Sequence, residues 1–149
     1  MANSEAILDT QTATQTQMTQ DTALESQPIE HPSYGQLLGK HVKMKSLDLR
    51  HSEFKVGREG TCHLILDEDN LPPSKLCRIS KHHFTIKKDL NDTTSPTYIH
   101  DHSRNGTYVN GRLIGPNKCM ILKHNDIISI AGVSIRAFVY YDLRYSMQS

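Results

Sequence analysis

Between residues 41 and 142 the sequence consists of short apolar stretches that alternate with polar residues and are separated by turn-forming residues. These stretches recur about every 8 to 12 residues, and no helical periodicity accompanies them. Such short strands are stable only when they pair and cover a common core, so the pattern predicts an all-β fold, a two-sheet β-sandwich. The expected strands are 41–46, 53–56, 62–66, 84–86, 97–99, 108–109, 112–114, 120–122, 127–130 and 133–141.

Turn residues define two connections within this pattern. Asn110-Gly111 lies between two short apolar stretches and is the strongest hairpin signal in the chain. Residues 67–76 are polar and contain two adjacent prolines, so we expect a loop there.

Residues 1–30 have a different composition from the rest of the chain. They contain no aromatic residue, Lys, Arg or Gly, so they lack the side chains for a core and are predicted to be a disordered tail. Their net charge is −5, whereas the remaining residues, with all 17 Lys and Arg, carry +6. A basic domain favours an anionic partner. We expect a linker at 31–40, the folded domain at 41–142 and a C-terminal tail at 143–149.

Every one of the five Gln residues in the tail follows a Ser or Thr. On composition alone this pairing has a chance of roughly one in a thousand. A low-complexity linker is the plain alternative. Ser/Thr-Gln is the site that DNA-damage-signalling kinases of the PI3-kinase-like class modify, so the tail resembles a substrate cluster. Its phosphorylation sites would be Thr10, Thr14, Thr16, Thr19 and Ser26.

Two segments beside the predicted strands carry phosphate-binding groups. Arg58 follows a strand end at Gly57, where glycine lets the backbone turn, and its planar guanidinium suits a phosphate. Ser80 and Lys81 supply a hydroxyl and an ammonium donor in another loop. His83 begins the next strand, and we therefore expect a buried brace that hydrogen-bonds the loops, not a base.

A third segment, Asn105-Gly106-Thr107, is a predicted turn. The Asn105 amide has a donor and an acceptor for a bound peptide backbone, and Gly106 is expected to have a positive φ. Together the three segments suit binding a phosphate from loops on a rigid β scaffold, and do not suit breaking a bond.

The ordered set Gly57-Arg58, Ser80-x-x-His83, Asn105-Gly106-Thr107 and Asn110-Gly111 resembles the signature of the forkhead-associated (FHA) domain over roughly residues 40–142. The longer runs 78–84 and 101–110 resemble one branch of it, the DNA-damage checkpoint kinase two family with its insect, loki-like members. That family carries a Ser/Thr-Gln cluster in the same place.

The resemblance implies a β-sandwich that binds phosphothreonine peptides through its loops. By position it assigns phosphate contacts to Arg58, Ser80 and Lys81, peptide contacts to Asn105, Arg78 and Arg104, and structural support to Gly57, His83, Gly106, Thr107 and Asn110. Because Arg78 and Arg104 are cationic, we expect an acidic preference at the third residue after the phosphothreonine. In the tail the third residues after the four threonines of Thr-Gln pairs are Ala13, Gln17, Thr19 and Thr22, and Ile29 follows Ser26 at that distance.

In this family an upstream kinase phosphorylates the tail, the FHA domain of a second copy binds it, and the homodimer brings two kinase domains together in the nucleus. We expect the same partners and nuclear location here, with other phosphoproteins as alternative partners. The chain has no kinase motif such as His-Arg-Asp or Asp-Phe-Gly. It is therefore expected not to be an enzyme, to need no cofactor, and to be an N-terminal fragment or a short isoform.

Three other functions have some support in the sequence. Asp101-His102-Ser103 suggests a hydrolase, but adjacent residues cannot converge as a catalytic triad. A metal site could use His82, His83, His100 and His102, but no Cys or carboxylate has a metal-site spacing beside them. Nucleic-acid binding is disfavoured because the basic residues are scattered and no aromatic stacking platform is present. No apolar run is long enough to span a membrane.

Overall fold

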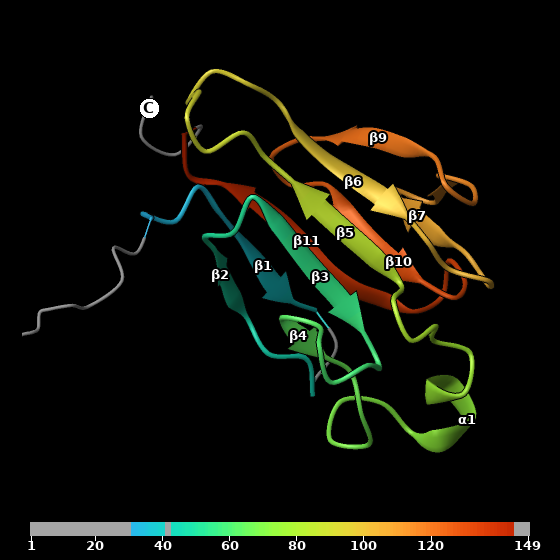
Figure 1. Cartoon of the computed structure of the whole chain (residues 1–149). Helices are drawn as coiled ribbons and strands as arrows, with labels where there is room; N and C mark the ends of the chain where they lie inside the picture. Colours follow the sequence, from blue (N-terminus) through green and yellow to red (C-terminus); the bar gives the residue numbers. More distant parts are fainter. Residues whose placement is uncertain (1–30, 41–42, 145–149) are drawn as a thin grey trace, which may run out of the picture. The chain divides into compact units, whose positions relative to one another are not determined.

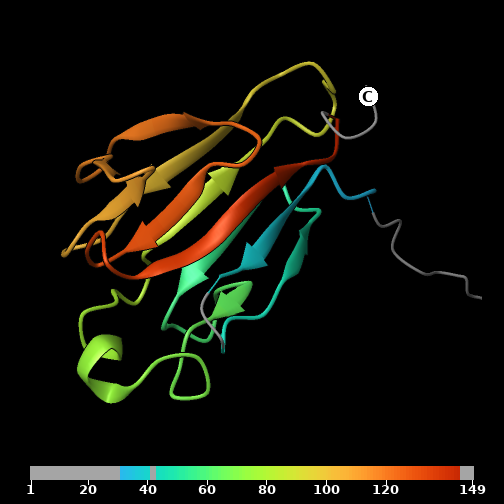
Figure 2. The ribbon, with the colours of Figure 1, turned by 180° about the vertical axis from the view of Figure 1, so that it is seen from behind.

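The computed structural model describes residues 31–40 and 43–144, which form two β-sheets packed against each other (Figures 1 and 2). One sheet has six strands in the order β2-β1-β11-β10-β7-β8, and the other has five in the order β4-β3-β5-β6-β9. The predicted two-sheet, all-β sandwich is confirmed, whereas the predicted disorder of 1–30 lies outside the described residues. The elements are β1 Gly35–Gly39, β2 Leu47–Leu49, β3 Glu53–Gly57, β4 Leu64–Ile65, α1 Pro73–Leu76, β5 Phe84–Lys87, β6 Thr97–Asp101, β7 Thr107–Val109, β8 Arg112–Leu113, β9 Cys119–Leu122, β10 Ile127–Ile130 and β11 Arg136–Asp142.

The core fills the space between the two sheets. Phe84 on β5 meets Phe138 on β11 edge to face, with ring centroids 6.4 Å apart, and both side chains are fully buried. The Tyr140 hydroxyl on β11 donates to the Thr97 hydroxyl on β6 across the same core, at 3.1 Å. Burying each such large apolar side chain contributes about 1.5–3 kcal/mol, so these cross-sheet contacts hold the sandwich together.

The first strand of the domain lies where the sequence predicted a linker. Residues 35–39 pair with both β11 and β2. The prediction of a linker at 31–40 is therefore wrong for residues 35–39. The glycines at the ends of this strand were interpreted as turn residues, but they are needed because neighbouring atoms pack closely against them. A Cβ on Gly39 would lie 2.1 Å from the Met44 carbonyl oxygen. The predicted strand at 41–46 is also wrong in its described part, 43–46, which contains no strand and leads from a turn at Lys43 into β2.

Other local predictions are confirmed with small changes. The hairpin at Asn110-Gly111 joins β7 and β8, and both residues have positive φ, 52° and 82°, as a tight hairpin turn requires. The predicted strand at 62–66 is shortened to β4, which pairs in parallel with β3. The predicted loop 67–76 ends in the single helical turn α1, which begins at Pro73.

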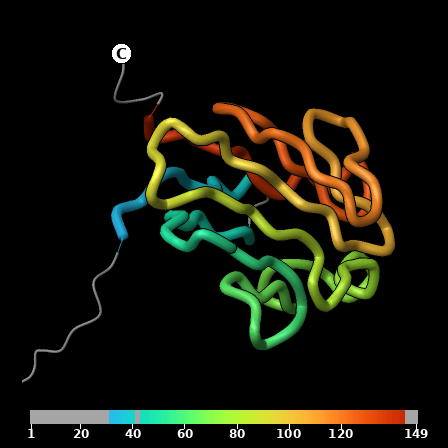
Figure 3. Tube along the Cα trace, turned by 45° about the horizontal axis from the view of Figure 1, so that its top comes forward, coloured from blue at the N-terminus to red at the C-terminus, as the bar shows by residue number. Residues whose placement is uncertain are grey.

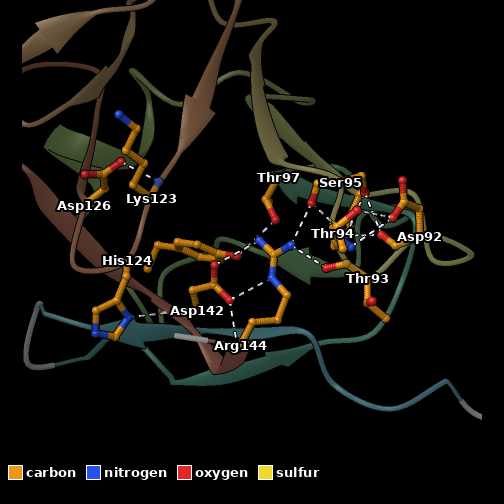
Figure 4. A network of polar contacts seen from close by, with 12 residues as sticks. Asp92, Thr93, Thr94, Ser95, Thr97, Lys123, His124, Asp126, Asp142 and Arg144 are labelled. Atoms are coloured by element: carbon orange, nitrogen blue, oxygen red, sulfur yellow. Dashed lines mark hydrogen bonds and ion pairs between the residues drawn. The ribbon is translucent and has the colours of Figure 1, made fainter. Parts of the chain in front are cut away.

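The end of β11 is tied to the loop before β6 by Arg144 (Figure 4). Its guanidinium pairs with Asp142 at 3.0 Å and donates to the backbone carbonyls of Thr93 and Ser95. The predicted C-terminal tail, 143–149, therefore starts with residues that belong to the packed domain. Its last five residues lie outside the described part of the chain.

The loops that carry the predicted site residues gather at one end of the sandwich. Figure 1 shows β3, β6 and β10 ending there, with α1 beside them and β5 beginning there. The described chain enters at residue 31 and leaves at residue 144 at the opposite end (Figure 3). Within residues 31–40 and 43–144, no helix has both the length and the apolar character to cross a membrane.

Candidate functional site

A pocket of about 610 Å³ opens among these loops. It brings together all six side chains that the sequence assigned to phosphate or peptide contacts. No acidic side chain lines it, so among the described residues its charge is entirely positive. The lining residues are Arg58, Cys77, Arg78, Ile79, Ser80, Lys81, His82, His102, Ser103, Arg104, Asn105, Pro116 and Asn117.

The loop after β3 is held against the loop before β5 by backbone hydrogen bonds. The N–H of Arg58 donates to the Ser80 carbonyl at 3.2 Å, and the N–H of Glu59 donates to the Lys81 carbonyl at 3.0 Å. A Cβ on Gly57 would lie 2.1 Å from the Lys81 carbonyl oxygen. Gly57 is thus required for this close approach. It does not have a positive φ, so the expectation that glycine is needed here to let the backbone turn is corrected.

The cationic groups of Arg58 and Lys81 line the pocket and have hydrogen-bond donors that no protein acceptor in the described residues binds. The Nε of Arg58 donates to the Ile79 carbonyl at 2.5 Å, which fixes the side chain along the loop. In the described residues no protein acceptor binds the two terminal nitrogens of Arg58 or the Nζ of Lys81. A planar fork and a point charge therefore remain available for an anion.

Ser80 links two loops and still has a proton to donate. Its hydroxyl oxygen accepts the backbone N–H of Arg104 at 3.0 Å. Its own N–H donates to Nδ1 of His83 at 3.1 Å. Because a hydroxyl can accept and donate at once, the Ser80 proton can point into the pocket.

His83 is fully buried behind the pocket. Its Nδ1 accepts from Ser80, so Nε2 carries the ring proton and donates to the Gly106 carbonyl at 2.9 Å. Burial lowers the pKa of His83, only partly offset by the bond to Gly106 and by nearby Asp101, so the ring is neutral. The two bonds span the loops before β5 and after β6.

Asp101 organises the loop after β6, a role that the sequence analysis missed. Its buried carboxylate accepts hydrogen bonds from the N–H and hydroxyl of Ser103 and from the N–H and hydroxyl of Thr107. The Ser103 hydroxyl accepts in turn from the N–H of Gly106 at 2.8 Å. The spacing Asp-x-Ser before a turn was the available signal, because Asp commonly accepts from the backbone two residues on.

The same contacts exclude the hydrolase arrangement. The Ser103 hydroxyl donates to Asp101 at 2.6 Å, and both residues are buried. The His102 ring points to Thr85 instead, with Nε2 3.2 Å from its hydroxyl. Among the described residues, no three His, Cys, Asp or Glu side chains are arranged to hold a metal ion.

The three residues predicted to contact the peptide differ in whether their side chains already have hydrogen-bond partners within the protein. Nδ2 of Asn105 donates to the Arg78 carbonyl at 2.9 Å, and the Arg78 guanidinium donates to the Ala131 carbonyl in the loop after β10. Gly106 has φ 104°, so its expected positive φ is confirmed. Within the described chain the Arg104 side chain has no hydrogen-bond or ion-pair partner, so its charge faces the pocket unpaired.

Asn110 does not line this pocket. From the hairpin tip its Nδ2 donates to Asp126 at 2.9 Å and its Oδ1 accepts the N–H of Ile127 at 2.9 Å. It supports the β7–β8 hairpin against the turn before β10, away from the cations.

The FHA domain family matches residues 54–131, which include every loop of this pocket. The chain belongs to the FHA domain family. It is 43% identical to the ovarian-specific serine/threonine-protein kinase Lok of Drosophila melanogaster over 82% of the chain and 29% of that protein. It is 33% identical to the serine/threonine-protein kinase chk-2 of Caenorhabditis elegans over 78% of the chain and 25% of that protein. These relatives confirm the resemblance to the checkpoint kinase two family.

The chain spans less than a third of the length of these two kinases. Its described residues contain no kinase domain. Among solved structures it is similar to the MEK1 FHA domain in complex with a HOP1 phosphothreonine peptide, with a TM-score of 0.57 and 28% identity over 74% of this chain and 98% of that one. The N-terminal FHA domain of S. cerevisiae Rad53p, with a TM-score of 0.57 and 22% identity over 77% of this chain and 98% of that one, shares the fold.

Proposed function

We propose that this FHA domain binds phosphothreonine in the pocket described above. The observation that carries the proposal is the set of donors from Arg58, Ser80 and Lys81, which converge on one pocket that no acidic residue lines. A phosphothreonine offers three acceptor oxygens and a charge of about −1.5 to −2 at pH 7, which this set matches in sign and in hydrogen-bonding capacity. The similar MEK1 FHA domain, solved with a phosphothreonine peptide, supports the assignment.

The peptide backbone would be held beside the phosphate by Asn105. Its Oδ1 has no protein donor among the described residues, while its Nδ2 bond to Arg78 fixes the direction of the amide. Arg78 and Arg104 add positive charge to the rim, which favours an acidic residue near the phosphothreonine.

The partner that we propose is the phosphorylated tail of a second copy of this chain. The tail contains four Thr-Gln pairs and one Ser-Gln pair. An upstream PI3-kinase-like kinase would phosphorylate it, and exchange of tails would make a homodimer in the nucleus. Two tethered contacts raise the effective concentration, so a modest affinity for each peptide suffices. In a longer protein such as the related kinases, the dimer would bring two kinase domains together for activation.

Binding to other phosphoproteins is the alternative within the same function. Of the four threonines in Thr-Gln pairs, Thr10 has the small Ala13 at the third following position and the other three have Gln or Thr there, so none has an acidic or a larger aliphatic residue. A client protein with a better third residue could therefore outcompete the tail.

The deciding experiment measures binding of the whole chain to a peptide of residues 8–30. The peptide is used unphosphorylated and singly phosphorylated at each threonine of a Thr-Gln pair, with Arg58→Ala as the control. Binding that requires both the phosphate and Arg58 supports the proposal and identifies the threonine that acts as the switch. If no form binds but unrelated phosphothreonine peptides do, the partner is another phosphoprotein. If no phosphothreonine peptide binds, the proposed function is wrong.

A further inference from the structure

Two histidines form one wall of the pocket, beside Lys81. The ring centroids of His82 and His102 lie 4.5 Å apart, and both Nε2 atoms contact the hydroxyl of Thr85, at 2.7 and 3.2 Å. A single hydroxyl can donate to only one of these nitrogens, so the other ring must donate to it. The two rings are thus joined through Thr85 into one hydrogen-bonded unit.

Thr85 is the buried member of this unit, whereas His82 is half-buried and His102 is exposed. Its neighbours Phe84 and Ile86 face the core, so Thr85 points to the outer face of the five-stranded sheet, between Lys55 and His100 on the adjacent strands. An outward residue on a sheet is normally exposed, yet Thr85 is 1% exposed. The rings of His82 and His102 both contact its hydroxyl and help to cover it.

The surroundings of both rings favour the neutral form. Burial lowers the pKa of His82, and the neighbouring His102 lowers it further. Burial also lowers the pKa of His102, with His100 adding to the effect. The other charged groups that face the two rings are Glu53 and Lys55 on β3, Arg58 and Glu59 after it, Lys81, Lys87 on β5, Asp101 on β6, and Arg104.

We propose that His82 and His102 are proton-accepting residues of the phosphate pocket, so that binding a dianion is coupled to uptake of a proton by this pair. A phosphate beside Arg58 and Lys81 brings negative charge next to two rings whose charged neighbours in the pocket are cations. That charge favours the protonated ring, and the protonated ring in turn attracts the phosphate. The complex then holds more protons than the free protein, so affinity rises as pH falls below neutral. This inference rests on the proposed function. It adds His82 and His102 to the residues that bind the phosphate.

Sulfate is the first probe because it remains a dianion across the range from pH 5.5 to 8, whereas a phosphate titrates there itself. The ring protons of the whole chain are followed by NMR through a pH titration, without sulfate and with saturating sulfate. The pKa of His82 or His102 is expected to rise with sulfate. The ring-proton signals of His31, which lies outside this pocket, are expected to be the same with and without sulfate.

Affinity for sulfate is then compared at pH 7.5 and 5.5. We expect it to increase about threefold or more on acidification in the wild type, and to be flat in the double variant His82→Asn/His102→Asn. The matched control His31→Asn should keep the wild-type increase. Circular dichroism checks that each variant is folded. If the double variant does not fold, the ring titration of the wild type still tests whether the pair takes up a proton.

Unmoved ring titrations, or a double variant that keeps the whole pH dependence, would overturn the inference. Binding of phosphothreonine peptides that depends on Arg58 would then still stand. If neither sulfate nor any phosphothreonine peptide binds, both the proposed function and the inference are wrong.

Discussion

The hydroxyl oxygen of Ser80 accepts the backbone N–H of Arg104 at a distance of 3.0 Å. This one side chain joins the loop before β5 to the loop after β6 while it lines the pocket between them. Ser80→Ala removes a donor to the phosphate and leaves the Arg104 N–H without its acceptor. We expect about a tenfold loss of phosphopeptide affinity, measured by calorimetry, because hydrogen bonds to charged groups contribute about 1.5–3 kcal/mol. Ser74→Ala on α1 should bind like the wild type, and an unaffected Ser80→Ala would remove Ser80 from the site.

Arg58 is expected to contribute more than Ser80. Arg58→Ala takes a bidentate donor from a dianion, with an expected cost of about 2–5 kcal/mol if the contact is desolvated, which is more than a tenfold loss of affinity. Fluorescence anisotropy with a labelled phosphothreonine peptide measures it. Arg112→Ala, which removes an exposed arginine of β8, controls for the loss of a positive charge alone. Equal losses in the two variants would mean that only net charge matters.

The buried carboxylate of Asp101 should be essential to the loop after β6. In Asp101→Asn an NH₂ group replaces one oxygen and faces N–H and O–H donors from Ser103 and Thr107. Leaving such donors unsatisfied should lower the free energy of unfolding by about 2–4 kcal/mol, as seen in urea denaturation. The exposed Asp69→Asn should change it by less than about 0.5 kcal/mol. A stable Asp101→Asn variant would show that the loop does not depend on this charge.

The buried His83 should make the free energy of unfolding depend on pH. Burial lowers its pKa in the folded chain, so below about pH 6.5 the unfolded chain binds more protons than the folded chain. The contribution is therefore present above that pH and lost as the pH falls. In His83→Gln, whose amide can replace both hydrogen bonds, the slope of unfolding free energy between pH 5.5 and 6.5 should be smaller by up to about 1.4 kcal/mol per pH unit. Urea titrations at several pH values test this, and a slope equal to that of the wild type would contradict it.

The rim charges predict a preference in the bound peptide. Because Arg104 is unpaired among the described residues and lines the pocket, a phosphothreonine peptide with Asp at the third following position should bind more tightly than one with Ile or Leu. Peptides that differ only at this position measure the preference. Arg104→Ala should abolish it without abolishing phosphate dependence. If Ile or Leu outranks Asp in the wild type, the acidic preference is wrong.

Patterns within a few residues predicted much of this fold. The alternation at Phe84-Thr85-Ile86, the Asn110-Gly111 turn and the positive φ of Gly106 follow from local backbone chemistry, and each is present in the structure. The six residues that the ordered loop motifs assigned to phosphate or peptide contacts all line one pocket, because they lie in loops that start or end at strands of the same sandwich.

The sequence alone did not reveal the features that depend on distant contacts. Whether Gly35 and Gly39 end a strand or form a linker depends on Tyr140 and Met44, which they approach too closely for a Cβ. The role of Asp101 depends on the way the following loop folds back on it, and the outward-facing Thr85 is buried beneath contacts that include His82 and His102. The sequence by itself determined the fold class and the family, since strand periodicity and turn chemistry act between neighbours in the chain. Only the tertiary structure decided which polar groups are buried, paired or free, since those states depend on residues that meet only after the sheets pack.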